Sequence, residues 1–167
     1  MNDRSYQLAA QLGAVLSAGG ATVTTAESCT GGGLAAALTA VAGSSGWFEG
    51  GLVTYSNRLK SKFLDVAPDV LKQHGAVSEA VVAAMVDGAV SATNANVAAA
   101  ISGIAGPDGG SEDKPVGTVC IAVGNSAHKH IFTAHFSGDR SAVREQSVVC
   151  ALEMLVKWVN ENQQNTV

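Results

Sequence analysis

Charged side chains are scarce in this sequence of 167 residues. Asp, Glu, Lys and Arg make up 14% of it, compared with about 25% in an average soluble domain. The net charge is −4, and the one basic cluster is the small group Arg58, Lys60 and Lys62. Because nucleic acids are bound by extended basic surfaces, we expect no nucleic-acid partner. A chain with so few charges is expected to cover part of its surface with copies of itself, so we predict a homo-oligomer.

Cysteine and long apolar runs are also in short supply. Cys29, Cys120 and Cys150 lie far apart, with no Cys-x-x-Cys motif. This pattern is typical of a reducing compartment and not of a disulfide framework. No run approaches the about 18 apolar residues of a membrane-spanning helix, and no signal peptide is recognisable at the N-terminus. We therefore predict a cytoplasmic protein without a membrane partner.

Several motifs that bind nucleotides or metals are missing. The sequence has no Gly-x-x-x-x-Gly-Lys-Ser/Thr loop and no His-Glu-x-x-His motif, and the glycines of 31–33 lack the Gly-x-Gly-x-x-Gly spacing. His128 and His130 would share one face of a strand, but no third ligand accompanies them. We interpret them as surface histidines, and we find no histidine placed to complete a Ser-His-Asp triad.

Helix and strand patterns alternate along the chain. We expect helices over 5–18, 32–42, 57–65, 68–74, 78–91 and 138–160, and strands over 22–26, 51–55, 97–101, 117–123 and 129–136. The last two strands read as a hairpin joined near Gly124. The irregular segment 103–115 is long enough to be functional or disordered.

These patterns predict the α/β fold class, with a mixed β-sheet flanked by helices in one layered domain. The domain is expected to span 1–167, with its core over about 5–160. The polar tail 161–167 is expected to be frayed.

The most informative segment leads from a β-branched run through Ser28 and Cys29 into the three glycines of 31–33 and then a helix. This order predicts a strand, a tight turn and a helix, with Ser28 at the turn. The free N–H groups of a helix start favour negative charge. A hydroxyl beside such groups is what acyl transfer requires. A turn that holds phosphate, or one that is only structural, is the alternative.

A serine needs a base, and Lys60 is the candidate. Lys60 follows the strand that ends at Tyr55, and the carboxyl ends of strands in open α/β sheets meet at one crevice. To act near pH 7 its pKa must fall by about 3 units, which burial can supply. Tyr55 would then relay the proton. In the alternative interpretation, which the spacing alone favours, Arg58, Lys60 and Lys62 form a solvated helix face.

Cys29 is a rival nucleophile beside Ser28. Adjacent side chains diverge in an extended or turning backbone, so both residues are not expected to face one crevice. A cysteine near a helix start can be reactive, but a small buried cysteine is the commoner state.

Several motifs, in the same order, resemble the CinA C-terminal domain family over about residues 5–160. The segment 24–32, Thr-Thr-Ala-Glu-Ser-Cys-Thr-Gly-Gly, is similar to the family's signature turn. The further matching motifs are Gly43-Ser44-Ser45, Trp47-Phe48, Thr54-Tyr55-Ser56-Asn57 with Lys60, Gly75-Ala76-Val77-Ser78, Ser102-Gly103-Ile104-Ala105-Gly106-Pro107, Lys114-Pro115-Val116-Gly117-Thr118, Phe136, Gly138-Asp139-Arg140 and Arg144.

The resemblance implies hydrolysis of the carboxamide of nicotinamide mononucleotide to nicotinic acid mononucleotide and ammonia. It implies Ser28 as nucleophile, Lys60 as general base and Tyr55 as an assisting hydroxyl, with no metal or organic cofactor. Backbone N–H groups of Thr30 and Gly31 would stabilise the oxyanion. Longer relatives carry a pyrophosphatase-like domain before this unit, and we expect that second activity to be absent here.

The nucleotide substrate implied by the resemblance needs donors for its phosphate. Loops rich in glycine and serine supply N–H and hydroxyl groups for this purpose. The candidates are Ser44, Ser45, Ser102, Gly103, Gly106 and Arg140. For each, ordinary turn chemistry is the alternative. Two other functions stay open: a catalytically idle nucleotide-binding regulatory module, and the same hydrolase acting on another amide.

Overall fold

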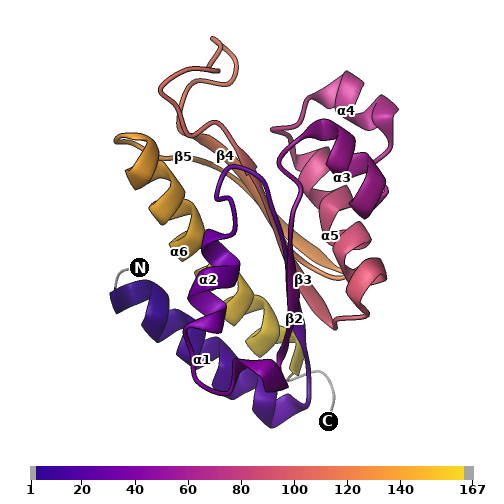
Figure 1. Ribbon diagram of the computed structural model, residues 1–167, viewed down its shortest axis with the longest axis vertical. Helices are drawn as coiled ribbons and strands as arrows, with labels where there is room; N and C mark the ends of the chain where they lie inside the picture. Colours follow the sequence, from indigo (N-terminus) through magenta and orange to yellow (C-terminus); the bar gives the residue numbers. More distant parts are fainter. Residues whose placement is uncertain (1–2, 164–167) are drawn as a thin grey trace.

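A five-stranded β-sheet lies between two layers of helices in the computed structural model, which describes residues 3–163 (Figure 1). The elements, in chain order, are α1 (Asp3–Gly19), β1 (Val23–Glu27), α2 (Gly33–Thr39), the 3₁₀ helix η1 (Ser44–Gly46), β2 (Phe48–Val53), α3 (Asn57–Leu64), α4 (Pro68–His74), α5 (Glu79–Thr93), β3 (Val97–Gly103), β4 (Thr118–Gly124), β5 (Lys129–His135) and α6 (Arg140–Gln163). The predicted α/β class, with a mixed sheet flanked by helices in one domain, is confirmed.

The sheet has the strand order β2-β1-β3-β4-β5. Strands β2, β1 and β3 are parallel, whereas β4 and β5 run antiparallel and form the expected hairpin. The three central strands β1, β3 and β4 are buried along almost their whole length. β3 and β4 are nearly continuous apolar runs, whereas β1 also buries Thr24, Thr25 and Glu27. Strands buried in this way are typical of a sheet that is covered on both faces.

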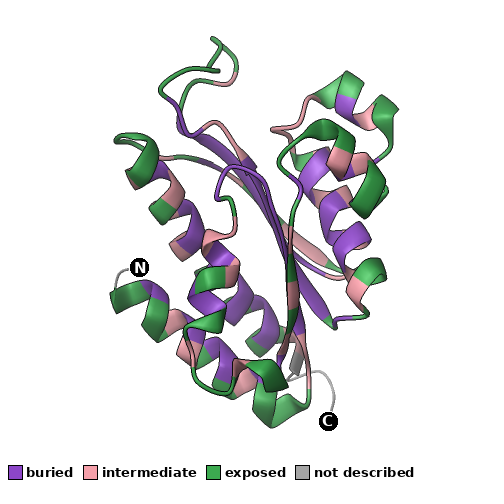
Figure 2. Ribbon diagram, viewed as in Figure 1, coloured by how far each residue is buried: buried purple, intermediate pink, exposed green. Residues whose placement is uncertain are grey.

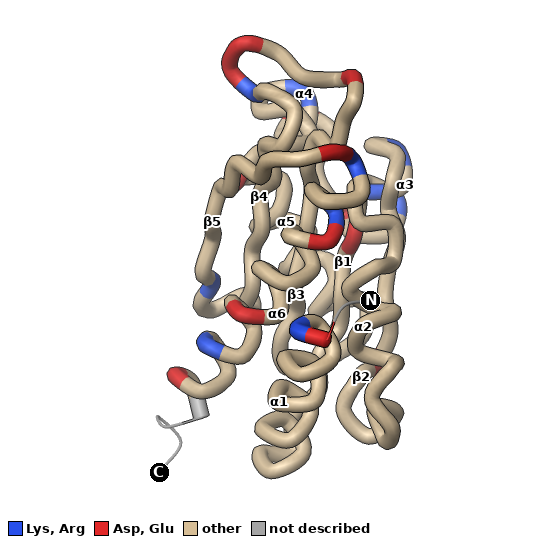
Figure 3. Tube along the Cα trace, turned by 90° about the vertical axis from the view of Figure 1, so that its left-hand side faces the viewer, with Lys and Arg blue, Asp and Glu red and all other residues tan. Residues whose placement is uncertain are grey.

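Two hydrophobic cores fill the spaces between the layers (Figure 2). On one face α1, α2 and α6 pack through residues such as Leu12, Leu38 and Leu155. On the other face α5 packs Val82 and Met85 against the sheet, with α3 and α4 outside it. Charged residues are few and scattered along the chain, in line with the low charge content (Figure 3).

Three predicted boundaries are corrected. The strand expected over 51–55 spans Phe48–Val53, because parallel pairing with β1 draws residues 48–50 into the sheet. The helix expected over 32–42 ends at Thr39. The tail expected to fray from residue 161 is helical to Gln163, and the rest of it, 164–167, lies outside the described residues.

The long segment between β3 and β4 is ordered and carries acidic residues at the edge of the molecule (Figure 3). Its two ends are tied together: the Ile104 N–H donates to the Thr118 carbonyl, and the Gly117 N–H donates to the Ile104 carbonyl. Of the two alternatives for this segment, disorder is therefore excluded. Among the helices of residues 3–163, none combines the length and the apolar character needed to cross a membrane.

Candidate active site

The three parallel strands end side by side, and the candidate site lies at their carboxyl ends. Glu27, the last residue of β1, is in register with Val53 of β2 and Ile101 of β3. The Thr54 N–H donates to the Glu27 carbonyl at 2.9 Å, and the Ser28 N–H donates to the Ile101 carbonyl at 2.9 Å. Ser28 therefore follows the central parallel strand directly, at the edge where open α/β sheets bind ligands.

Lys60 reaches Ser28 from the helical layer of α3, α4 and α5, on the other face of the sheet from α2. It lies on α3, whose first turn is capped by the Ser56 hydroxyl, which accepts from the Leu59 N–H at 3.2 Å. The Lys60 side chain is buried, with the residue 1% exposed. Its Nζ lies 3.1 Å from the Ser28 Oγ, across 32 residues of sequence. The solvated-face interpretation is thus wrong for Lys60, although Arg58 and Lys62 are exposed.

The other contacts of the Lys60 amine are carbonyl oxygens. Nζ donates to the carbonyl of Thr54 at 2.9 Å and to that of Tyr55 at 3.2 Å. Within residues 3–163, no carboxylate lies within ion-pair distance of Nζ. Burial lowers the pKa of Lys60 below the usual value of a lysine, because the charged form loses its hydration.

Cys29 is a poor competitor for the role of nucleophile. It is 6% exposed and belongs to the core on the α1, α2 and α6 side of the sheet. Burial raises the pKa of its thiol to about 11. Because the thiolate is the reactive form of cysteine, this environment keeps Cys29 in its unreactive state at neutral pH.

Glu27 is the main residue of the site that sequence reasoning missed. Its carboxylate is fully buried and accepts from the Thr30 hydroxyl at 2.6 Å and from three N–H groups of the turn and the start of α2. These donors belong to Gly32, Leu34 and Ala35, at 2.8 to 3.1 Å. An acid at the end of an apolar strand, just before a glycine turn and a helix, was the available signal.

The N–H groups left unoccupied near Ser28 differ from the expected ones, partly because Glu27 occupies several of them. The start of α2 is occupied by its carboxylate, and the Gly31 N–H donates to the Ser28 carbonyl at 3.0 Å. The Gly31 N–H is therefore not a free donor, which corrects the expected Thr30 and Gly31 pair. Among the N–H groups of residues 28–33, those of Cys29 and Thr30 donate neither to a backbone carbonyl of the described chain nor to the Glu27 carboxylate.

A pocket of about 270 Å³ opens beside Ser28. It is lined by residues that follow the three parallel strands and by the first residue of α6: Ser28, Cys29, Tyr55, Gly103, Ile104, Ala105, Gly106, Asp108, Gly109 and Arg140. Its walls carry one basic and one acidic side chain, Arg140 and Asp108. A concave site of this size with few polar groups is suited to a small molecule.

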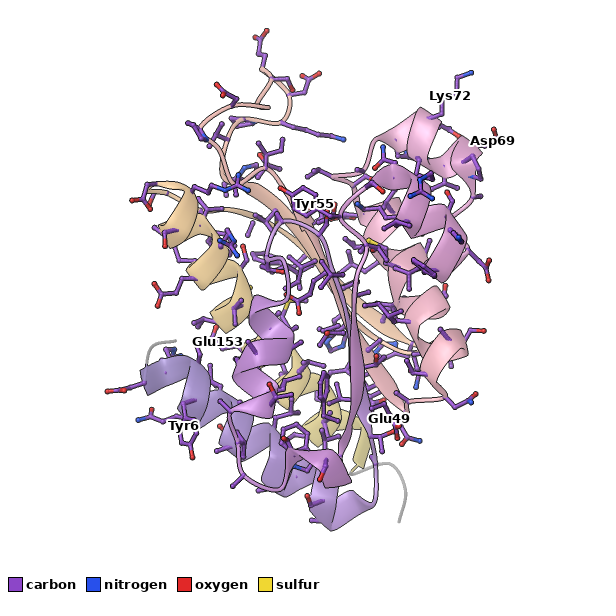
Figure 4. All side chains as sticks on the ribbon, in the orientation of Figure 1. Tyr6, Glu49, Tyr55, Asp69, Lys72 and Glu153 are labelled. Atoms are coloured by element: carbon purple, nitrogen blue, oxygen red, sulfur yellow. The ribbon has the colours of Figure 1, made fainter. Side chains whose placement is uncertain are left out.

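Tyr55 contributes to this pocket in an unexpected way. Its ring is exposed between the two helical layers (Figure 4), and its hydroxyl accepts from the Arg140 guanidinium at 3.2 Å. Arg140 also donates to the Gly106 carbonyl at 2.7 Å. The Tyr55 carbonyl, and not its hydroxyl, contacts Lys60. The expected proton relay through the Tyr55 hydroxyl therefore does not follow from this arrangement.

The remaining candidates fall into two groups. Gly103 and Gly106 line the pocket. Ser102 is buried within β3, 1% exposed, and is not part of the lining. Ser44 and Ser45 form η1 just before β2 and lie at the amino end of the strand, opposite Ser28. Their assignment to the substrate site is corrected, because residues that precede a parallel strand lie at the other edge of the sheet.

Between residues 3 and 163, no group of three or more His, Cys, Asp or Glu side chains is placed to hold a metal ion. The His128 and His130 rings meet edge to face with their centroids 5.0 Å apart. The Nε2 atom of His130 lies 3.4 Å from the Oε2 atom of Glu161.

Comparisons with known proteins agree with this geometry. The family model of the CinA C-terminal domain matches residues 5–159. The chain is 56% identical over 157 residues to the nicotinamide-nucleotide amidohydrolase PncC of Escherichia coli K12, covering 93% of this chain and 95% of that protein. It is 54% identical over 154 residues to the protein of the same name from Pseudomonas putida, covering 92% and 96%. Among solved structures, the competence/damage inducible protein CihA of Agrobacterium tumefaciens superposes with a TM-score of 0.93 at 39% identity, covering 96% and 98%.

Proposed function

Because the chain belongs to the CinA C-terminal domain family, we propose that it hydrolyses the carboxamide of nicotinamide mononucleotide to nicotinic acid mononucleotide and ammonia. The similar proteins of Escherichia coli and Pseudomonas putida are named nicotinamide-nucleotide amidohydrolases. The observation that carries the proposal is the 3.1 Å contact between Ser28 Oγ and the buried Lys60 Nζ. An alcohol beside an amine with a lowered pKa is an activated nucleophile.

The contacts of Lys60 support a serine–lysine mechanism. An uncharged amine has two N–H donors and one lone pair. The carbonyl oxygens of Thr54 and Tyr55 can only accept, so they take the two N–H groups. In the structure Nζ donates to Ser28 Oγ at 3.1 Å, and the Ser28 hydroxyl points to the Tyr55 carbonyl at 3.5 Å. Once the amine has lost a proton, its lone pair can accept the hydroxyl proton of Ser28. In this protonation state the lysine acts as the general base, without a histidine.

The reaction proceeds in two halves. Lys60 takes the Ser28 proton as Oγ attacks the carboxamide carbon, and a tetrahedral oxyanion forms. The protonated Lys60 returns the proton to the leaving nitrogen, the C–N bond breaks, and ammonia departs from the acyl-enzyme. Water then attacks the ester carbon, and Lys60 takes the proton of that water and returns it to Ser28 Oγ as the acid is released.

The oxyanion needs donors, and the turn supplies two. The N–H groups of Cys29 and Thr30 are not taken by carbonyls of the described chain. We assign them this role, in which each preorganised donor typically contributes about 3 kcal/mol to the transition state. Glu27 helps because it occupies the N–H groups further along α2 and fixes the turn.

The rest of the substrate occupies the pocket beside Ser28. Gly103 and Gly106 line this pocket, and Arg140 is the cation available for the phosphate. Tyr55 holds Arg140 through the 3.2 Å contact of its hydroxyl.

We also propose, from the sequence, that the protein associates with copies of itself and lies in the cytoplasm.

Ammonia release by the purified protein tests the proposal. We expect turnover of nicotinamide mononucleotide without added metal, loss of activity in Ser28→Ala, and retention of most activity in Cys29→Ala. Ammonia release that survives in Ser28→Ala would remove the serine mechanism. Thermal stabilisation by the nucleotide without turnover would identify an idle binding module. Faster turnover of another amide in a small panel, which includes free nicotinamide, would reassign the substrate.

A further inference from the structure

The pocket beside Ser28 contains a carboxylate to which the proposed reaction gives no role. Asp108 and Arg140 are the two charged residues of its lining. Arg140 is held by the Gly106 carbonyl and the Tyr55 hydroxyl. Asp108 is exposed, and it forms no ion pair with any other residue of the described segment. The pocket thus presents a free negative charge to whatever binds beside the nucleophile.

The loop backbone is held in place on both sides of Asp108. Asp108 is two residues from Gly106, whose carbonyl is held by Arg140 at 2.7 Å. The following residue, Gly109, has a φ of 94°, in the left-handed region that favours glycine. Further along, the Ser111 N–H donates to the Lys114 carbonyl at 2.8 Å. The Asp108 carboxylate therefore belongs to a part of the loop whose backbone is held by hydrogen bonds on both sides.

The other acids nearby are placed differently. Glu112 and Asp113 belong to the same loop but are absent from the pocket lining. Glu27 is fully buried, and its oxygens are occupied by the turn and α2. Asp108 is thus the acid whose charge a ligand in this pocket meets.

Resting on the proposed function, we infer that Asp108 determines specificity, because it favours amides carried on a cationic pyridinium ring over neutral amides. In nicotinamide mononucleotide the ring nitrogen carries a permanent positive charge close to the carboxamide. With that carboxamide at Ser28, the ring lies in the pocket that Asp108 lines. Opposite charges in one pocket attract each other, and because Asp108 is exposed the attraction is that of a partly solvated pair.

The same charge acts against the product. Hydrolysis converts the neutral carboxamide into a carboxylate on the same ring. The new negative charge meets Asp108 and is repelled, while the ring charge is unchanged. Asp108 therefore assists binding of the amide more than binding of the acid, and this difference favours product release.

The test uses a matched pair of ligands. Reduced nicotinamide mononucleotide keeps the carboxamide, ribose and phosphate, but its dihydropyridine ring is uncharged. Dissociation constants for both compounds are measured by calorimetry on full-length Ser28→Ala protein, with and without Asp108→Asn. We expect Asp108→Asn to weaken binding of the cationic compound by about 3- to 10-fold and that of the neutral one by less than about 2-fold, as for a partly exposed ion pair.

Matched variants separate this role from a general effect of charge. Asp113→Asn removes one negative charge from the same loop outside the pocket, and it should leave both constants within about 2-fold. In otherwise wild-type protein, Asp108→Asn should lower kcat/KM for nicotinamide mononucleotide by a similar factor, and it should change inhibition by the acid product less than it changes binding of the amide. Equal losses for both ligands, or none for either, would overturn the inference. If the wild-type protein binds the nucleotide but releases no ammonia, the proposed function fails instead.

Discussion

Lys60 and Ser28 meet at 3.1 Å in a site where the two further partners of the lysine amine are backbone carbonyls. The absence of a carboxylate partner in the described chain is as informative as the contact itself. Burying an ammonium without a counter-ion is costly, and this cost lowers the pKa of Lys60. The geometry that positions the amine therefore also favours its basic form.

The first prediction concerns the pH dependence of hydrolysis. Only the uncharged Lys60 can take the Ser28 proton, so kcat/KM should rise with pH and reach a plateau above the pKa of Lys60. Because burial lowers that pKa, the plateau should begin at a pH below about 10.4, the pKa of an ordinary lysine. Lys60→Met should lower kcat by about 100-fold or more and abolish the rising limb.

Lys62→Met is the matched control, since Lys62 lies on the same helix and is exposed. It should keep both the rate and the profile. An effect of Lys60→Met confined to KM would make Lys60 a binding residue and contradict its role as base.

The second prediction concerns stability and follows from the same shift. Between the lowered pKa of folded Lys60 and the about 10.4 of the unfolded chain, the unfolded state binds more protons. The contribution of this group to stability therefore rises with pH across that window, and it is constant below and above it. The difference in unfolding free energy between wild type and Lys60→Met should shift in favour of wild type as pH rises. Urea titrations at several pH values measure it, and a difference that stays flat would contradict the lowered pKa.

The third prediction concerns Glu27, whose two carboxylate oxygens accept from the turn and the start of α2. Glu27→Gln keeps the shape but turns one acceptor into a donor, which then faces N–H groups. We expect a loss of about 2 to 4 kcal/mol in unfolding free energy, typical of an unsatisfied buried network. Glu49→Gln, an exposed acid on β2 (Figure 4), should change stability by less than about 0.5 kcal/mol. Equal stability of the two variants would refute the structural role of Glu27.

Much of this site could be predicted from the sequence because its residues directly follow β-strands. Ser28 was predicted from a glycine turn after a strand, which is a local rule. The position of Lys60 after a strand made it a candidate, but the spacing favoured a solvated helix face, and the resemblance to the family supplied its role as base. The burial of Lys60 could not be predicted, since Arg58, Lys60 and Lys62 look alike in sequence and only the contacts of Lys60 with the strand ends distinguish it. The role of Ser44 was misjudged because a loop motif does not reveal which edge of the sheet it occupies.

The strands show the same limit. The buried strands β3 and β4 were readily predicted from their apolar runs. Strand β2, with glycine at positions 50 and 51, has a weak local preference, and its start is set by pairing with β1. The role of the Tyr55 hydroxyl depends on a contact with Arg140, 85 residues away, which spacing does not encode. The contacts of Glu27 lie within eight residues, so its role was open to a local rule that was not applied.

The fourth prediction separates two roles for Tyr55. Its hydroxyl contacts Arg140 at 3.2 Å, so Tyr55→Phe should raise KM by a few-fold and leave kcat nearly unchanged. Arg140→Ala should raise KM further. The double variant should be no worse than Arg140→Ala alone, with a coupling of about 0.5 to 3 kcal/mol. A large fall of kcat in Tyr55→Phe at constant KM would instead support a proton relay through the hydroxyl.

The last prediction links helix packing to the base. Gly88 lies on α5 against the end of α3, and a Cβ at this position would overlap the Leu64 carbonyl group. Backbone atoms cannot turn aside as a side chain can, so Gly88→Ala should push α3 away from α5 and cost about 1 to 3 kcal/mol of unfolding free energy. Since α3 carries Lys60, the remaining folded protein should also lose kcat. Gly46→Ala, where a Cβ would meet no atom within 4 Å, should change neither quantity. Loss of stability in Gly88→Ala with full kcat in the folded fraction would show that the lysine holds its place independently of how closely α3 packs.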